Sequence, residues 1–386
     1  MAHNIINGTP FDDLLHDTPD HDTINGFGGN DEIEAHRGGS DTLNGGAGND
    51  ELYSYDEDDI LDGGSGADLM NGGDGNDIYY VDHVRDKAEE NFFGGGVDTV
   101  WSSVSYTLSH ADKGIEHLIL SGVASITGTG NGLYNILVGN GGNNVLVGNG
   151  GDDQLFGGNG NDYVNGGIGN DVLNGGAGID YVDYTNGTRD GQAFIGATAG
   201  VTVNLNLVGA QNTKGAGLDT LVNIDNLTGS NYGDTLTGNG IRNVLSGFAG
   251  NDVINGGGGD DLLLGGLGAD TLTGGSENDR FDYDKSTIES PAGLGRDRIT
   301  DFRGNESSSG DQIDLRDLDA NTLATGNQGF SWINNAAFTA AGQLRYAGGV
   351  LRGNTDADLA AEFEIQLLGT PALFVNPVSV GTDILL

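Results

Sequence analysis

The sequence from Gly157 to Asn174 reads GGNGNDYVN GGIGNDVLN, which is one nine-residue unit written twice. Each unit has glycine at its first, second and fourth positions, aspartate at its sixth and an apolar residue at its eighth. Units of this kind occur twenty times along the 386 residues. The sixth position is Asp in seventeen of them and Asn in three, and the eighth is always apolar. The fold therefore follows from the geometry of one repeated unit.

The units form three blocks separated by two segments that lack them. In the first block the step between units is nine residues, apart from one extra residue, Ala35. The intervening segments contain TVWSSVSYTL (Thr99–Leu108) and VTVNLNLVG (Val201–Gly209), whose β-branched and aromatic residues predict strands. We expect β-rich spacers, the first of which continues the repeat structure.

After the third block glycine becomes less frequent. GRDRITDF (Gly295–Phe302), GDQIDL (Gly310–Leu315) and FEIQLLG (Phe363–Gly369) predict strands of a β-rich, sandwich-like end domain. The predicted division is 1–80 for the first block, 81–129 for the first spacer, 130–183 for the second block, 184–228 for the second spacer, 229–282 for the third block and 283–386 for the end domain.

The spacing of the unit predicts its local structure. Three residues such as Tyr163–Asn165 form a strand whose middle side chain points inward. The six residues before them reverse the chain, and glycine tolerates the positive φ that such a turn needs. Two units make one coil of eighteen residues, and successive coils stack as parallel strands about 4.8 Å apart. We predict an all-β fold, a parallel β-roll or β-helix solenoid.

The composition leaves little material for a hydrophobic core. Glycine accounts for 72 residues and apolar residues for only 36%, and ordering so many glycines is entropically costly. There is no cysteine, so disulfides and thiolate metal sites are excluded. No stretch has the length of a transmembrane helix. Another source of stability is needed.

The charge indicates that source. Asp and Glu number 57 against 15 Lys and Arg, a net charge of -42. Nucleic acids and anionic membranes are poor partners for such a chain, because they need a basic surface. Acidic chains are often disordered, but here the aspartates are periodic. The pattern favours a chain that becomes compact with multivalent cations.

Stacked coils place aspartates over one another. Turns eighteen residues apart lie directly above each other, which brings Asp153 near Asp171 and Asp162 near Asp180. Carboxylates this close repel unless a cation lies between them. Oxygen ligands without His or Cys select calcium over zinc or copper, and backbone carbonyls at the second and fourth positions, such as those of Gly158 and Gly160, complete an oxygen cage. The sequence predicts several calcium ions as the only cofactor.

The predicted ligands are sixth-position aspartates and the carbonyls of the glycines in well-formed turns. The aspartates are Asp31, Asp41, Asp50, Asp59, Asp68, Asp77, Asp153, Asp162, Asp171, Asp180, Asp234, Asp252, Asp261, Asp270 and Asp279. The glycines are Gly46, Gly48, Gly64, Gly66, Gly73, Gly75, Gly158, Gly160, Gly167, Gly169, Gly176, Gly178, Gly257, Gly259, Gly266 and Gly268.

Some units depart from the pattern. Asn135, Asn144 and Asn243 offer a neutral oxygen in place of a carboxylate, so we expect weak or vacant sites there. The turns that end at Asp13, Asp22 and Asp59 are poor in glycine. A single Asp beside Gly is most often a turn former, and this reading stays open for the poor units.

These repeats resemble the calcium-binding nonapeptides of the hemolysin-type, repeats-in-toxin (RTX) family. The resemblance covers about three-quarters of the chain. It implies secretion by type I machinery, with that machinery as a partner. We therefore expect an extracellular protein, although Met1–Gly8 shows no signal peptide.

The end domain resembles the C-terminal domain of serralysin-type M10 peptidases. The resemblance is carried by GRDRITDF, GDQIDLRDL, AFTAAGQLRY and the AEFEIQL run, and it implies a C-terminal secretion signal. The last residues, Asp383–Leu386, resemble the acidic-then-apolar ending of serralysins. The segment Asp356–Leu359 lacks the glycine that accompanies aspartate in the family's late turn, and we place no calcium there.

Motifs of the common enzyme classes are missing from the sequence. None of the seven histidines belongs to an HExxH helix, no serine lies in GxSxG, and no Gly-Lys pair supports a P-loop. We predict no catalytic residues and no enzymatic activity. The competing hypothesis is a secreted enzyme relative, either a serralysin-like metallopeptidase remnant or a polysaccharide-modifying enzyme.

The function that these observations favour is a secreted calcium-binding protein with a structural or adhesive role. Carboxylate repulsion and glycine freedom keep the chain open where calcium is scarce, and millimolar calcium outside the cell couples binding to folding. Whether the protein is an adhesin, a matrix component or part of a surface layer stays open, as do its oligomeric state and its cell-surface partner.

Overall fold

The computed structural model describes residues 3–36, 38–90, 95–108, 114–189, 192–283, 295–304, 310–375 and 382–386. The described residues form strands and turns with no α-helix, and the predicted all-β parallel solenoid is confirmed. The chain divides into two compact units, Met1–Asp180 and Tyr181–Leu386. In the described residues no helix has the length and apolar character needed to cross a membrane.

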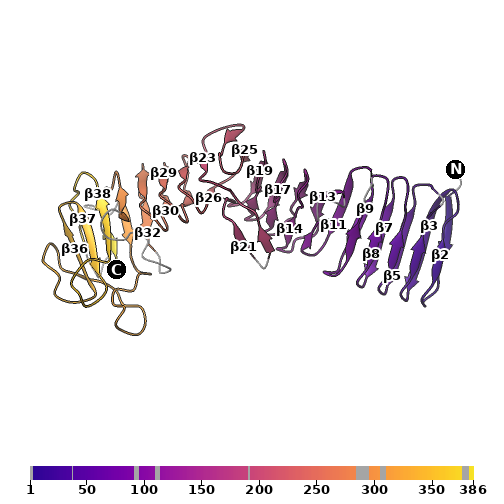
Figure 1. Cartoon of the computed structure of the whole chain (residues 1–386), viewed down its shortest axis with the longest axis horizontal. Helices are drawn as coiled ribbons and strands as arrows, with labels where there is room; N and C mark the ends of the chain where they lie inside the picture. Colours follow the sequence, from indigo (N-terminus) through magenta and orange to yellow (C-terminus); the bar gives the residue numbers. More distant parts are fainter. Residues whose placement is uncertain are drawn as a thin grey trace. The chain divides into compact units, whose positions relative to one another are not determined.

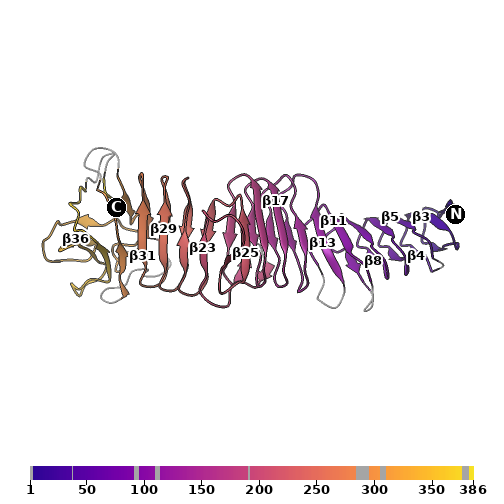
Figure 2. The same cartoon turned by 90° about the horizontal axis from the view of Figure 1, so that it is seen from above.

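Three parallel ladders build the first unit (Figures 1 and 2). The longest contains β1 (His3–Asn7), β3 (His21–Gly28), β5 (Thr42–Ala47), β7 (Ile60–Ser65), β9 (Ile78–Val81), β11 (Asp98–Ser102), β13 (Ile115–Leu120), β15 (Ile136–Val138), β17 (Gln154–Asn159) and β19 (Val172–Ala177). Facing it are first β2 (Leu14–His16), β4 (Glu32–Glu34), β6 (Glu51–Tyr53), β8 (Leu69–Asn71) and β10 (Lys87–Glu89), and then β12 (Tyr106–Thr107), β14 (Thr127–Thr129), β16 (Val145–Val147) and β18 (Tyr163–Asn165).

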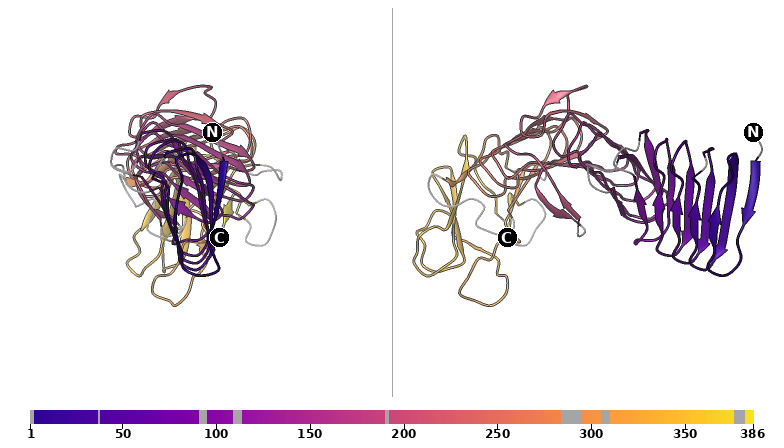
Figure 3. Two further views of the ribbon diagram at one scale, coloured as in Figure 1. Left: turned by 90° about the vertical axis from the view of Figure 1, so that its right-hand side faces the viewer. Right: turned by 45° about the vertical axis from the view of Figure 1, so that its right-hand side comes forward.

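The register of these ladders is one coil of eighteen residues. Leu137 pairs with Leu155, and Leu155 pairs with Leu173. Each of these eighth-position side chains is fully buried, and such residues line a narrow core between the facing ladders. Figure 3 shows the N-terminal coils of this unit stacked one behind another. Burying one such side chain stabilises the fold by about 1.5–3 kcal/mol.

The second unit repeats this plan with two parallel ladders. One contains β20 (Tyr181–Asp183), β26 (Asn226–Thr228), β28 (Val244–Ser246), β30 (Leu262–Leu264), β32 (Arg280–Asp282), β34 (Gln312–Asp314) and β39 (Ile384–Leu385). The other contains β23 (Thr202–Asn204), β27 (Thr235–Thr237), β29 (Val253–Gly257), β31 (Thr271–Gly275), β33 (Asp297–Ile299) and β38 (Phe363–Leu367).

Where this unit is described, antiparallel strand pairs occur in the second spacer and near the C-terminus. Two short pairs, β21 (Gly187–Arg189) with β22 (Gln192–Phe194) and β24 (Gln211–Asn212) with β25 (Leu218–Val222), lie in the second spacer. Near the C-terminus β37 (Val350–Asn354) runs antiparallel to both β38 and β36 (Gln343–Ala347), and β35 (Ser331–Trp332) is parallel to β36.

Both ladders of the second unit extend beyond residue 283. Ile299 and Leu367 pair in one ladder, with Ile313 and Ile384 paired in the other, and all four are buried. They take the inward place that eighth-position residues hold in the repeats. The segment from 283, predicted as an end domain, thus stacks directly on the third block, and in its described residues the antiparallel pairing involves the strands from β36 to β38.

Candidate metal centre

The sixth-position aspartates form a column in which one carboxylate oxygen joins neighbouring coils. The backbone N–H of Asp31 donates to Oδ1 of Asp50 over 2.7 Å, and the N–H of Asp50 donates to Oδ1 of Asp68 over 2.8 Å. The same bond joins Asp153 to Asp171 and Asp252 to Asp270, each over 2.8 Å. This contact stacks the carboxylates of successive turns, as the eighteen-residue spacing predicts.

The second carboxylate oxygen is buried and lacks a hydrogen-bond donor in many of these turns. In the described part of the chain this holds for Oδ2 of Asp31, Asp41, Asp50, Asp59, Asp68, Asp77, Asp153, Asp162, Asp252, Asp261, Asp270 and Asp279. All of them are predicted ligands. Leaving such an oxygen unsatisfied costs about 1–3 kcal/mol or more for a charged group, and a cation is the partner that removes this cost.

Backbone carbonyls converge on the same space. A Cβ added to Gly45 would lie 2.5 Å from Oδ2 of Asp50 and 2.7 Å from the carbonyl oxygen of Gly63, one coil further on. The carbonyls at the second and fourth positions point between turns, since a Cβ on Gly158 would lie 2.7 Å from the carbonyl oxygen of Asn140. The site thus consists of hard oxygen atoms, which suit calcium.

The backbone at the second position separates two kinds of turn. In what we call open turns this residue has a positive φ, as in Gly158 (103°) before Asp162. The larger residues Phe27, Tyr55, Asn149 and Phe248 adopt the same conformation, with φ between 71° and 75°. In every repeat whose second-position residue is described, a buried Oδ2 atom without a donor occurs in an open turn. The second position before Asp41 is residue 37, outside the described residues.

In what we call closed turns the second-position N–H donates to the sixth side chain. The donors are Thr9, Thr18, Asn131, Asn140, Ser230 and Asn239, the acceptors are Asp13, Asp22, Asn135, Asn144, Asp234 and Asn243, and the distances are 2.5–2.8 Å. The hydroxyls of Thr18 and Ser230 also donate to their aspartates. These oxygens already have the donors that a cation would replace.

The three asparagines use their amide groups in the same way. Nδ2 of Asn135, Asn144 and Asn243 donates to the carbonyl oxygens of Glu116, Ile126 and Asp225, over 3.1, 3.1 and 2.6 Å. Each of these carbonyls lies in the preceding coil. An asparagine side chain therefore donates to a carbonyl of the preceding coil, which an aspartate carboxylate cannot do.

The predicted aspartate ligands do not all lie in the same kind of turn. Asp234 lies in a closed turn, and Asp59, whose turn lacks glycine, lies in an open one. Asp171 and Asp180 follow second-position glycines with φ of 92° and 103°. The predicted glycine ligands have positive φ values with the exception of Gly169.

Acids outside the repeats extend the column, and sequence reasoning missed them. Asp86 accepts the N–H of Asp68, Asp98 accepts that of Asp77, and in the second unit Asp297 and Asp311 accept those of Asp270 and Asp279. The eighteen-residue step from Asp68 to Asp86 was a usable signal. The other three follow steps of 21, 27 and 32 residues, which hide them from a search for a fixed period.

One part of the column concentrates carboxylates. Oxygens of Asp77, Glu90 and Asp98 lie within 4.8 Å of one another, and all three side chains are buried. Glu90 accepts hydrogen bonds from the Tyr79 hydroxyl and, over 3.1 Å, from the N–H of Gly73. Burial is the main cause that raises the pKa of Glu90 to about 8 and of Asp98 to about 7. Three acids around one space favour a divalent cation.

Burial also raises the pKa of the repeat aspartates. It brings the pKa of Asp59, Asp153 and Asp252 to about 8, with neighbouring carboxylates adding to the effect. The pKa of Asp162 and Asp270 is raised to about 6, again chiefly by burial. A proton or a metal ion is needed to offset the charge in these turns.

The chain is similar to one known protein family. The hemolysin-type family model, which describes four copies of the RTX calcium-binding nonapeptide repeat, matches residues 7–39, 37–70, 53–82, 129–164, 148–182, 228–263 and 256–285. The chain carries RTX calcium-binding repeats. Because RTX nonapeptide repeats bind calcium and the stacked aspartates fit it, calcium is the cofactor of this protein.

The RTX match covers just under half of the chain and coincides with the three blocks. The matched residues end at 285, so the serralysin-like nature of the end domain stays a prediction. No curated protein matches the chain.

Proposed function

We propose that this RTX protein is a secreted, non-enzymatic exoprotein that folds when calcium fills its open turns. The observation that carries the proposal is the set of buried Oδ2 atoms without donors, exemplified by Asp50, Asp153 and Asp252. The ligands of each ion are the carboxylates of open turns one coil apart together with the carbonyls at their second and fourth positions.

Folding depends on calcium because each coil has few other sources of stability. The apolar core between the ladders is narrow, and the net charge of -42 opposes compaction. Binding energy at the open turns then becomes folding energy. Extracellular calcium at submillimolar to millimolar levels suits weak sites of this kind, whereas the low calcium of the cytosol leaves the chain open.

An open chain suits export through a channel. The RTX repeats support type I secretion, and the segment from residue 283 is proposed to hold the signal that the machinery recognises. The folded, repetitive β-solenoid then serves as a structural or adhesive element outside the cell.

A calcium titration followed by circular dichroism tests the proposal. We expect a disordered chain in chelator and a cooperative gain of β-structure at submillimolar to millimolar calcium. Magnesium at the same concentrations should not replace calcium, because it requires a smaller, near-octahedral site. Full β-structure in excess chelator would contradict the proposal.

A further inference from the structure

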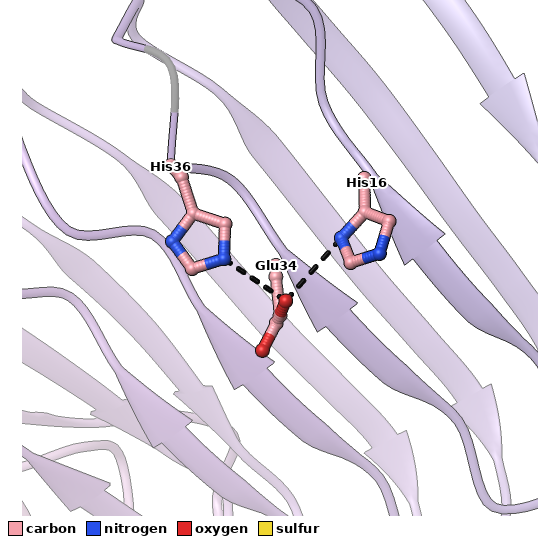
Figure 4. Close-up of side chains that lie close together, drawn as sticks. All are labelled: His16, Glu34 and His36. Atoms are coloured by element: carbon pink, nitrogen blue, oxygen red, sulfur yellow. Dashed lines mark hydrogen bonds and ion pairs between the residues drawn. The ribbon is translucent and has the colours of Figure 1, made fainter.

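A cluster of nitrogen and oxygen ligands lies outside the calcium column, near the N-terminus. His16, Glu34 and His36 point toward one another on the outer side of the sheet that contains β2 and β4 (Figure 4). Nδ1 of His16 lies 3.3 Å from Oε2 of Glu34, and Nε2 of His36 lies 2.9 Å from the same oxygen. Among the described residues, this is the one such group that contains histidine.

The regular repeat of the first block and the one extra residue within it both contribute to this cluster. His16 and Glu34 are directly paired in the parallel ladder of β2 and β4. Ala35, which is buried, donates its N–H to the carbonyl of Tyr53, just as Asp17 donates to Glu34. Ala35 therefore makes the bond that first-position residues make in other coils, and the stretch that leads to Asp41 is one residue longer than in the other turns, with His36 beside Glu34.

The aromatic ring of Tyr55 packs against His36. The rings of His36 and Tyr55 are 4.2 Å apart, and those of His16 and His36 are stacked at 6.4 Å. His16 and His36 have side chains that are 49% and 44% exposed, so a metal ion reaches them from solvent. Glu32, on the same face of β4 two residues before Glu34, adds negative charge.

The distances fit a tetrahedral metal. Zinc bonds of about 2.0–2.1 Å place neighbouring ligand atoms about 3.3 Å apart, and the three ligand atoms here lie within 4.8 Å of one another. Two imidazole nitrogens favour zinc-type ions, whereas calcium prefers sites made only of oxygen.

We propose that His16 Nδ1, Glu34 Oε2 and His36 Nε2 bind one divalent transition-metal ion of the zinc class, with the fourth position open to solvent. This site is independent of the calcium sites in its ligands, its face of the coil and its metal preference. A protein folded by calcium thus carries a second, chemically distinct metal site.

The test uses the full chain with its calcium sites saturated. Isothermal titration with Zn²⁺ should show one site, and Co²⁺ should give the visible absorption of tetrahedral coordination by nitrogen and oxygen. His16→Ala, Glu34→Gln and His36→Ala should each weaken Zn²⁺ binding on the order of tenfold or more. Circular dichroism in calcium should match that of the unaltered protein, because all three side chains are on the outer face.

His3→Ala is the matched control. His3 lies in the first coil on the opposite sheet and, like His16, is exposed. Its replacement should leave Zn²⁺ binding unchanged. The proposal is overturned if saturating calcium abolishes Zn²⁺ binding, if His3→Ala weakens it as much as His16→Ala does, or if Zn²⁺ does not bind and the three side chains form only hydrogen bonds.

Discussion

At the scale of single residues, the second position of each turn decides what its aspartate can do. A negative φ there directs the N–H to the carboxylate, as in Ser230 and Asp234, and the turn is closed. A positive φ turns that N–H away and leaves Oδ2 without a hydrogen-bond donor, as in Asp252 after Phe248. Two aspartates in the same sequence position of adjacent coils therefore have different expected affinities for calcium.

This difference is tested by replacing the two aspartates in turn. Asp252→Asn should remove about one calcium ion and raise the calcium midpoint of folding on the order of tenfold, because it takes a charge from an open turn. Asp234→Asn should leave the number of bound ions unchanged, since Ser230 already satisfies that side chain. Equilibrium dialysis with calcium gives the count. Equal losses from the two variants would refute the distinction between open and closed turns.

Bulky residues in open turns retain backbone strain. Phe27 has a φ of 71° although its side chain is 57% exposed, and such a conformation costs an L-residue about 1–2 kcal/mol. We expect Phe27→Gly to raise the free energy of unfolding in calcium by about 1 kcal/mol, after the greater freedom of glycine in the unfolded chain is counted.

Phe11→Gly provides the control for that variant. Phe11 is also exposed and belongs to the closed turn that ends at Asp13, and its φ is not positive. Glycine should destabilise the protein there, because only the entropy cost remains. Urea unfolding of both variants gives the comparison, and a loss of stability with Phe27→Gly would show that the positive φ carries no strain.

At the scale of secondary-structure elements, the repeat strands depend on their inward eighth-position residues. Leu155 in β17 is paired with Leu137 on one side and Leu173 on the other, and all three are fully buried. Truncating Leu155 would therefore remove its packing against both neighbouring coils, and the effect would not stay within one coil.

Leu155→Ala should lower the free energy of unfolding in calcium by about 2–5 kcal/mol, the usual cost of a cavity at a buried leucine. Ile179→Ala, in the same block but 55% exposed, should change it by less than about 0.5 kcal/mol. Urea denaturation at saturating calcium measures both. Comparable small effects would mean that the inward column is not the stabilising core.

At the scale of the whole molecule, charge adds to the conformational entropy that opposes folding. The chain carries a net charge of -42, and burial raises the pKa of Asp59, Asp153 and Asp252 to about 8 from an ordinary value of 3.8. The folded chain therefore binds protons more tightly than the unfolded chain. Stability without calcium is fully present below about pH 4 and is lost as the pH rises through 6 to 8.

Acid should thus partly replace calcium. In calcium-free buffer we expect more β-structure at about pH 5 than at about pH 8, because protons neutralise the open turns. In calcium the sign is opposite: the calcium concentration at the folding midpoint should be higher at the lower pH, since protons and calcium compete for the same oxygens. Circular dichroism measures both, and a calcium-free fold that strengthens with rising pH would contradict the account.

The sequence by itself determined the coil, the parallel ladders, the inward column and the choice of calcium. These follow from local rules, since a nine-residue period places every eighth residue inside and every sixth residue over its neighbour. Leu137, Leu155 and Leu173, and the aspartates from Asp31 to Asp77, were assigned to their places from spacing alone.

Only the tertiary structure decided which aspartates are open to a cation and which acids beyond the repeats join them. Residue type alone does not fix this conformation, because Asn149 has a positive φ at the second position whereas Asn131 and Asn140 lie in closed turns. Asp98 and Asp297 reach the column across steps of 21 and 27 residues. His16 and His36 meet at Glu34 for the same reason: strand pairing, which a linear pattern does not contain, brings them together.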